Sequence, residues 1–213
     1  MCLSEINTCW KYVDPSIRIP ERFRGFWEAL HYSVAYNQHS TNQEAFQHGG
    51  EAILSFDQTA CRNPLRGCDR SGLGRWAWTR FRGSQGTFFR VVCGYCPCPS
   101  RKGATTVWSQ HQNYLDTQNC TKNPRTAFKD DLLAEIIKWK KAKDQIILLI
   151  DWNEDVRGPA LATWLRKAGM RDIILEQHGT DAPATVDKKT STYPIDGIFA
   201  TEGISASRCR VRR

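Results

Sequence analysis

An aspartate, a tryptophan and an asparagine directly follow the most hydrophobic run of the chain, Ile146 to Ile150. The apolar run predicts a buried strand, in which Asp151 and Asn153 would face one way and Trp152 the other. A carboxylate at the end of such a strand could hold a metal ion or orient a water molecule, and an amide could bind a phosphate oxygen. Spacing alone leaves open the alternative that Asp151 or Asn153 only caps the turn after the strand.

Four further short motifs lie in order along the chain, namely Leu3-Ser4-Glu5, Gly49–Ser55, Val91–Pro97 and Pro194–Phe199. Together with Ile150-Asp151-Trp152-Asn153, they resemble strand-end motifs of the metal-dependent endonuclease/exonuclease/phosphatase family. That family, which includes pancreatic deoxyribonuclease and abasic-site endonucleases, writes these motifs as L-Q-E, GG-x-A-I-L, V-x-x-x-Y-x-P, R-I-D-Y-I-F and G-D-F-N. The similarity extends over most of the chain, from Glu5 to Phe199.

The resemblance implies a four-layered α/β sandwich that hydrolyses phosphodiester or phosphomonoester bonds with a divalent metal, usually Mg²⁺, with Mn²⁺ as an alternative. It assigns roles to six residues: metal ligand (Glu5), phosphate contact (Tyr95), orientation of the attacking water (Asp151), transition-state contact (Asn153), orientation of a catalytic histidine (Asp196) and substrate contact (Thr185). These roles are chemically consistent, because a hard cation prefers carboxylate oxygen and a phosphate that gains charge needs fixed donors.

The sequence departs from the family pattern at both ends. The family's catalytic histidine belongs to a C-terminal S-D-H motif, but no histidine follows Phe199, and the strand that should precede Glu5 is also missing. We therefore expect an incomplete domain over residues 1–200, followed by a basic tail at 201–213. The sheets of this domain should lack edge or terminal strands. Hydrolysis should then be weak or absent. The alternatives are a catalytically inactive module that binds nucleic acid or protein, and a remnant of a mobile element or gene model.

Two histidines could replace the missing one, His48 before the Gly49-Gly50 pair and His111 downstream of Tyr95, although a lone loop histidine is more often solvated or structural.

Five cysteines, Cys61, Cys68, Cys93, Cys96 and Cys98, suggest zinc as an alternative, but they lack the paired knuckles of a structural zinc site, and buried free thiols are expected. The strand face of Trp76, Trp78 and Arg80 could stack bases or belong to the core.

These residues need a scaffold, which the hydrophobic periodicity predicts. We expect helices over 20–30 and from Pro124 and Pro159, a loop over 61–74, and strands over 31–37, 52–56, 75–82, 87–95, 145–150 and 195–200. Hairpins come first and helices separate the later strands, so the fold class is α/β (α+β), a sandwich of two mostly antiparallel sheets flanked by helices.

Composition limits the remaining possibilities. The 213 residues, 40% of them hydrophobic, suffice for one core and exclude a disordered chain. No run is long enough for a membrane span, and nine cysteines partly in apolar segments favour an intracellular protein. The net charge of +8 favours a nucleic acid partner, and no organic cofactor is expected. The substrate stays open among DNA, RNA, inositol phosphates and other phosphoesters.

Overall fold

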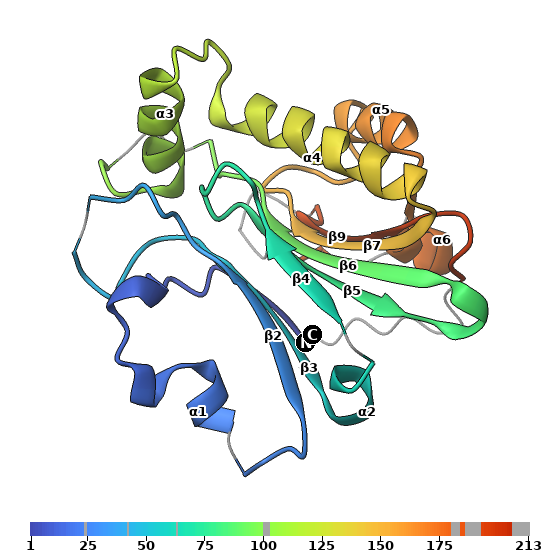
Figure 1. The fold of residues 1–213 in the computed structure, drawn as a ribbon. Helices are drawn as coiled ribbons and strands as arrows, with labels where there is room; N and C mark the ends of the chain where they lie inside the picture. Colours follow the sequence, from blue (N-terminus) through green and yellow to red (C-terminus); the bar gives the residue numbers. More distant parts are fainter. Residues whose placement is uncertain are drawn as a thin grey trace.

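Two β-sheets form the centre of the protein, and helices cover the outer side of each (Figure 1). The computed structural model describes residues 1–23, 25–41, 43–62, 64–99, 103–179, 184–185 and 193–205. The smaller sheet is antiparallel with the order β1-β3-β2, from Cys2–Ser4, Glu51–Phe56 and Leu30–Ala35. The larger sheet has the order β4-β5-β6-β7-β9-β8, from Leu65–Cys68, Trp76–Arg82, Phe88–Tyr95, Asp144–Asp151, Asp196–Ala200 and Arg171–Asp172.

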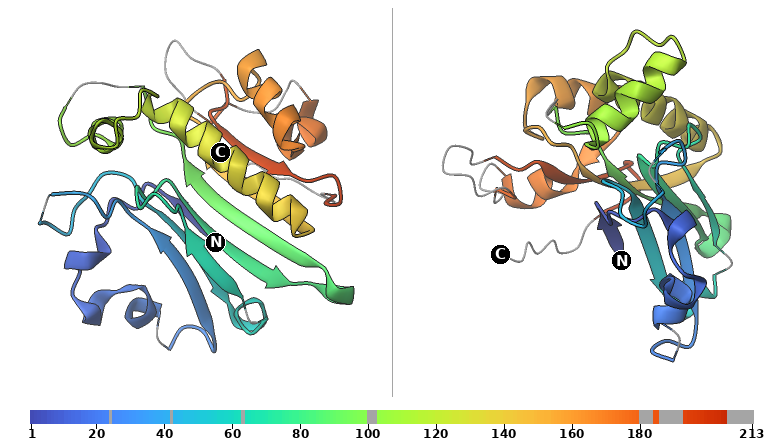
Figure 2. Two further views of the ribbon diagram at one scale, coloured as in Figure 1. Left: turned by 45° about the horizontal axis from the view of Figure 1, so that its top comes forward. Right: turned by 90° about the vertical axis from the view of Figure 1, so that its left-hand side faces the viewer.

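Six α-helices of the described residues surround these sheets: α1 (Ile19–Phe23), α2 (Asp57–Ala60), α3 (Val107–Thr117), α4 (Pro124–Lys141), α5 (Pro159–Ala168) and α6 (Ile173–His178). Figure 2 shows α4 and α5 on the outer face of the larger sheet and α1 on the opposite side of the molecule. This arrangement confirms the predicted sandwich of two mostly antiparallel sheets with flanking helices. The expectation that strands are missing from the sheets stays a prediction.

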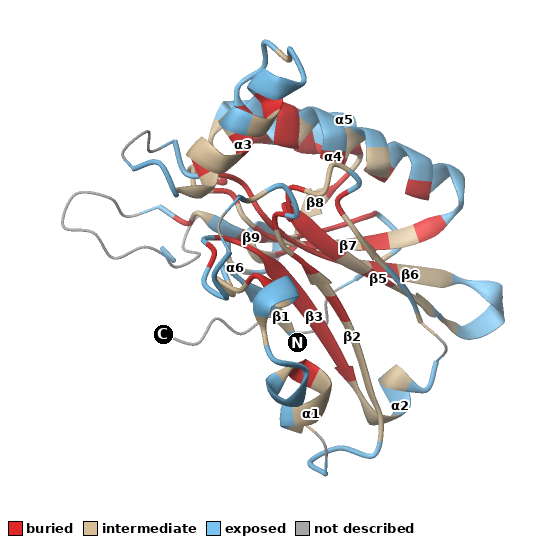
Figure 3. Ribbon diagram, turned by 60° about the vertical axis from the view of Figure 1, so that its left-hand side comes forward, coloured by how far each residue is buried: buried red, intermediate tan, exposed pale blue. Residues whose placement is uncertain are grey.

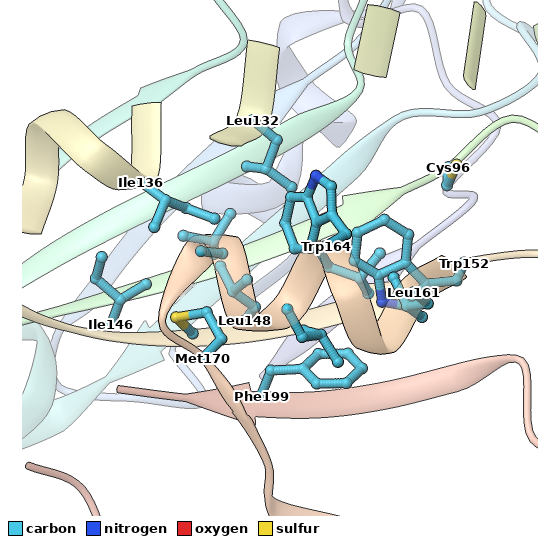
Figure 4. Close-up of a cluster of buried hydrophobic side chains, with 14 of the residues drawn as sticks. Cys96, Leu132, Ile136, Ile146, Leu148, Trp152, Leu161, Trp164, Met170 and Phe199 are labelled. Carbon is cyan, nitrogen blue, oxygen red and sulfur yellow. The ribbon is translucent and has the colours of Figure 1, made fainter. Parts of the chain in front are cut away.

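The main core lies between the larger sheet and helices α4 and α5 (Figure 4). Trp152 is fully buried there and meets the rings of Phe128, Trp164 and Phe199 at centroid distances of 5.7, 5.0 and 6.2 Å. The core therefore anchors Trp152, the residue that separates Asp151 from Asn153.

Asn123 caps α4 through a hydrogen bond from the backbone N–H group of Thr126, as its position before Pro124 predicts.

Side chains that alternate along β3 fill two further core layers, one on each face of the smaller sheet. Ala52 and Leu54 of β3 pack toward α1, whereas Ile53 packs with Ala77 and Cys93 of the larger sheet. Figure 3 shows the buried residues that run along β3 and β7. Because each sheet has apolar residues on both faces, the two sheets and the helices form four layers.

Two local predictions are wrong. The helix expected over 20–30 ends at Phe23, and Leu30 already pairs with Phe56 as the first residue of β2. The helical spacing of Phe23 and Trp27 arises because both rings pack on Phe56, at centroid distances of 5.8 and 4.5 Å. The loop expected over 61–74 contains β4, which pairs with β5.

The expected hairpin, strands and C-terminal helices are present within a few residues of their predicted bounds. Beyond residue 200 the chain stays attached to the sheet, because the backbone N–H group of Thr201 donates to the carbonyl of Ile146. The tail boundary stays a prediction, and its residues 206–213 lie outside the described part. None of the described helices combines the length and apolar character needed to cross a bilayer.

Candidate functional site

Three of the predicted residues form one row across the larger sheet. Tyr95 at the end of β6 pairs in parallel register with Asp151 at the end of β7, and Asp151 pairs in antiparallel register with Asp196 at the start of β9. Residues in register on neighbouring strands point to the same face, so these three side chains lie on the face opposite Trp152. The row therefore gathers a phenol and two carboxylates at one sheet edge.

Asn153 extends this row in the turn after β7. Its backbone is in the left-handed region, with φ of 49°, and its N–H group donates to Asp151 Oδ1 at 2.9 Å. Its side-chain Nδ2 donates to the carbonyl of Cys96 at 3.0 Å. Asp151 thus does cap the turn, as the structural alternative proposed. The same hydrogen bond also holds Asn153 beside Asp151.

Glu5 comes to this site from the other sheet. It follows β1 with φ of 52°, it is exposed, and it lines the same cavity as Tyr95. Fully buried Glu51 on β3 accepts hydrogen bonds from the Ser4 hydroxyl and from the Cys93 thiol. A buried acid therefore positions the end of β1 and the exposed acid that follows it.

The sequence did not single out Glu51. The only available signal was a charged residue at the start of the otherwise apolar segment Ala52–Leu54. Burial holds the pKa of Glu51 well above its usual range and outweighs the hydrogen bonds from Cys93 and Ser4, which lower it. Burial therefore favours the uncharged form of Glu51.

The electrostatics of the row follow from partial burial and from the close carboxylates. Burial raises the pKa of Asp151 to about 6, and the negative charges of Asp196 and Glu5 add to this effect, whereas the hydrogen bond from Asn153 opposes it. Burial and the neighbouring Glu5 also raise the pKa of Tyr95, so its phenol keeps its proton. The site therefore offers a carboxylate that ionises near neutral pH beside a hydrogen-bond donor.

Arg125 joins the two loops that carry these residues. From the first turn of α4, it donates to the carbonyl of Pro97 at 2.7 Å and to that of Trp152 at 2.9 Å. It also forms an ion pair with Glu154 at 3.0 Å. Sequence analysis missed this residue, because its partners lie 28 and 27 positions away in the chain.

Thr185 serves the backbone of the neighbouring segment. Its hydroxyl oxygen accepts hydrogen bonds from the N–H groups of Ile195 at 2.9 Å and Asp196 at 3.2 Å. It therefore fixes the start of β9, and substrate contact by Thr185 stays a prediction.

The two candidate histidines differ in position. His111 is buried, its Nε2 lies 3.2 Å from the carbonyl oxygen of Leu73, and burial lowers its pKa to about 3, so it is a neutral structural residue. His48 is exposed and lines a cavity of about 170 Å³ together with Glu5 and Tyr95. The structure thus brings His48, and not His111, to the site.

A second cavity, of about 320 Å³, lies on the other side of the row and is lined by Cys2, Cys93, Asp151 and Asp196 among others. Within the described residues, no group of three or more His, Cys, Asp or Glu side chains could hold a metal ion together. Cys93 and Cys96 belong to different core clusters, so their thiols do not converge as zinc ligands would. Trp76 is buried against Phe128 and forms part of the core.

No protein-family model matches the sequence, and no curated protein matches it. Solved structures do resemble the fold. The catalytic domain of Xenopus laevis APE2 superposes with a TM-score of 0.60 at 15% identity, over 95% of this chain and 73% of that one. A 3′-5′ exonuclease from Neisseria meningitidis gives 0.57 at 13% identity, over 95% and 76%. The human Nocturnin catalytic domain gives 0.56 at 15% identity, over 94% and 68%. The chain therefore has the endonuclease/exonuclease/phosphatase fold.

Proposed function

We propose that this protein hydrolyses phosphodiester bonds of nucleic acid with the help of a divalent metal ion, and only weakly, because the sequence departs from the family pattern at the catalytic histidine. The observation that carries the proposal is the row of Tyr95, Asp151 and Asp196, with Glu5 delivered to it from the other sheet. The Neisseria relative is described as a 3′-5′ exonuclease, and a structure of the same fold from Archaeoglobus fulgidus is described as an AP endonuclease. The net charge of +8 favours the same polyanionic substrate.

Each residue has a distinct task in this reaction. Asp151, with a pKa of about 6, is ionised above that pH and accepts a proton from the attacking water. Asn153 and Tyr95 lie beside it and donate hydrogen bonds to the phosphate oxygens that gain charge. Asp196 pairs with Asp151 in register, and a water molecule beside it would protonate the leaving oxygen.

The carboxylates fit a divalent metal of the magnesium type. Glu5 and Asp196 raise the pKa of Asp151, so the row holds negative charge that a cation would stabilise. Mg²⁺ takes one or two protein carboxylates and leaves its other positions to water and phosphate, which suits Glu5 with Asp151 nearby. When bound, the metal would supply Lewis-acid stabilisation of the phosphate.

Nicking of supercoiled plasmid by the purified chain tests this proposal. We expect relaxed circles in MgCl₂ or MnCl₂, none in EDTA, and at least a hundredfold slower nicking by Asp151→Asn. Asp130→Asn, which changes an exposed aspartate paired with Lys122, is the matched control and should nick at the normal rate. Salt-sensitive binding of DNA without any metal-dependent nicking would overturn the proposal and support an inactive binding module.

A further inference from the structure

A larger cavity, of about 610 Å³, lies between α3 and the loop that joins β2 to β3. These two segments lie on the same side of the molecule (Figure 1). We call this space the α3 cavity. Its walls are formed by Asn37, His39, Ser40, Thr41, Glu44, Phe46, Gln47, His48, Ala104, Thr105, Gln110, Asn113, Tyr114, Thr117 and Gln118.

Hydrogen bonds within and between the two walls hold the α3 cavity in shape. Buried Asn37 donates from Nδ2 to Gln110 Oε1 of α3 at 2.9 Å. Buried Gln47 accepts from the N–H group of Asn37 and donates to its carbonyl, both at 2.9 Å. Gln110 in turn donates to the carbonyl of Thr105 at 2.8 Å. The cavity is therefore braced from both sides without a ligand.

The described walls favour a planar, neutral, polar ring. Among the lining residues that the structure describes, none is a lysine or an arginine, and Glu44 carries the formal charge. Four lining residues carry rings, which pack in pairs as His39 with Tyr114 and Phe46 with His48, and amides supply donors and acceptors. A nucleobase has this combination of flat faces and a polar edge.

The α3 cavity adjoins the candidate active site. His48 lines both this cavity and the smaller one that contains Glu5 and Tyr95. The adjacent residues Thr105 and Thr106 likewise line one cavity each. A ligand in the α3 cavity could therefore be joined to a phosphate beside Glu5 and Tyr95 without leaving the protein surface.

We infer that the α3 cavity binds a nucleobase of the substrate, next to the phosphate at the Glu5–Tyr95 end of the site. The inference rests on the proposed function, because it names the unit joined to the phosphate that is hydrolysed. The ring of Phe46 is 52% exposed and packs against the ring of His48 at a centroid distance of 4.9 Å, so the pair forms an aromatic wall for a base. The side chains of Glu44 and Asn113 make no hydrogen bond or ion pair within the described ranges and line the cavity where a base edge would lie.

Glu44 also sets a preference among bases. A carboxylate accepts hydrogen bonds but cannot donate them, so it favours bases with an exocyclic amino group. Adenine, cytosine and guanine carry such a group and uracil does not. Adenosine, cytidine and guanosine should therefore bind more tightly than uridine, and Glu44→Gln should reduce this difference.

Equilibrium dialysis with the four radiolabelled nucleosides, in EDTA, tests the inference on the whole chain. We expect saturable binding that Phe46→Ala weakens about tenfold or more, because the stacking face is lost. Phe26→Ala is the matched control, since Phe26 is 77% exposed and lies outside the α3 cavity. If Phe46→Ala lowers the thermal midpoint, Asn113→Ala at an exposed helix position gives an independent test and should also weaken binding.

Equal binding by wild type and both cavity variants, or no saturable binding of any nucleoside, would overturn the inference. Hydrolysis of bis(p-nitrophenyl) phosphate in MgCl₂ separates this result from a failure of the proposed function, because that substrate has no base. Hydrolysis without nucleoside binding refutes the base site alone. Nucleoside binding that Phe46→Ala weakens, without hydrolysis, supports the base site and refutes the proposed reaction.

Discussion

The buried carboxyl group of Glu51 accepts a hydrogen bond from the Cys93 thiol of the larger sheet at 3.1 Å. The same carboxyl group accepts from the hydroxyl of Ser4, the residue next to Glu5, at 3.1 Å. Cys93 belongs to β6, the strand that ends in Tyr95. Glu51 therefore connects both sheets just behind the residues proposed to contact the metal and the phosphate.

Substitution of Glu51 should distinguish a neutral carboxyl group from a buried charge. Glu51→Gln keeps the size and an acceptor oxygen, so the free energy of unfolding should change by less than about 1 kcal/mol. Glu51→Ala leaves a cavity and unpaired donors at Ser4 and Cys93, which should cost about 2–4 kcal/mol. Urea denaturation at pH 7 measures both values. Equal losses for the two variants would show that the carboxyl group is ionised in the folded protein.

Asp151→Asn should stabilise the metal-free protein while it removes activity. In the folded state the pKa of Asp151 is raised to about 6 from 3.8, so the unfolded chain loses this proton first as pH rises. Stability is therefore lost between about pH 4 and pH 6 and stays reduced above that range. After a discount for partial exposure, the variant should be about 1–2 kcal/mol more stable at pH 7.5.

Thermal and urea denaturation of Asp151→Asn and wild type in EDTA, at pH 4 and pH 7.5, checks this prediction. The difference between the two proteins should be near zero at pH 4 and should grow with pH. A difference that is the same at both pH values would mean that Asp151 titrates normally in the fold.

Removal of Arg125 should loosen the loops that carry Tyr95 and Asn153. Arg125→Ala removes two hydrogen bonds to loop carbonyls and the ion pair with Glu154, so the free energy of unfolding should fall by about 1–3 kcal/mol. Because the residue acts through the loops, the nicking rate at saturating DNA should be lower for Arg125→Ala than for wild type. The rate of Arg125→Lys should lie between these two. Arg166→Ala on α5, whose side chain donates to the nearby Thr163 hydroxyl, is the control.

The control variant should match wild type in both unfolding and nicking. If Arg125→Ala weakened only the affinity for DNA and left the rate at saturation unchanged, Arg125 would be a phosphate contact and not a positioning residue.

His111 should make the protein sensitive to acid. Its pKa is lowered from 6.5 to about 3 by burial, so as pH falls the unfolded chain binds a proton that the folded protein excludes. Stability is thus lost from about pH 6.5 downward, by about 3 kcal/mol at pH 4. His111→Gln can keep a donor to the carbonyl of Leu73 but does not titrate. Urea denaturation from pH 7 to pH 4 should show a flatter profile for this variant than for wild type.

The local signals in the sequence determined most of the longer strands and the positions of the site residues on them. Apolar alternation and the Asn123-Pro124 cap predicted the hairpin of β5 and β6, the helix α4 and the strand β7. These signals are reliable because they act over a few residues. They also placed Tyr95 and Asp151 at strand ends, and pairing in the sheet then brings the two side chains into register.

Only the tertiary structure decided which residues support the site. Glu51 lies 47 positions from Ser4 and 42 from Cys93, which donate to its carboxyl group, and Arg125 joins loops that follow two different strands. The aromatic spacing that suggested a helix over 20–30 came from packing on Phe56, and the α3 cavity formed where Asn37 of a loop met Gln110 of a helix, 73 positions away. Such contacts depend on which distant segments become neighbours, and no local periodicity in a single sequence encodes that information.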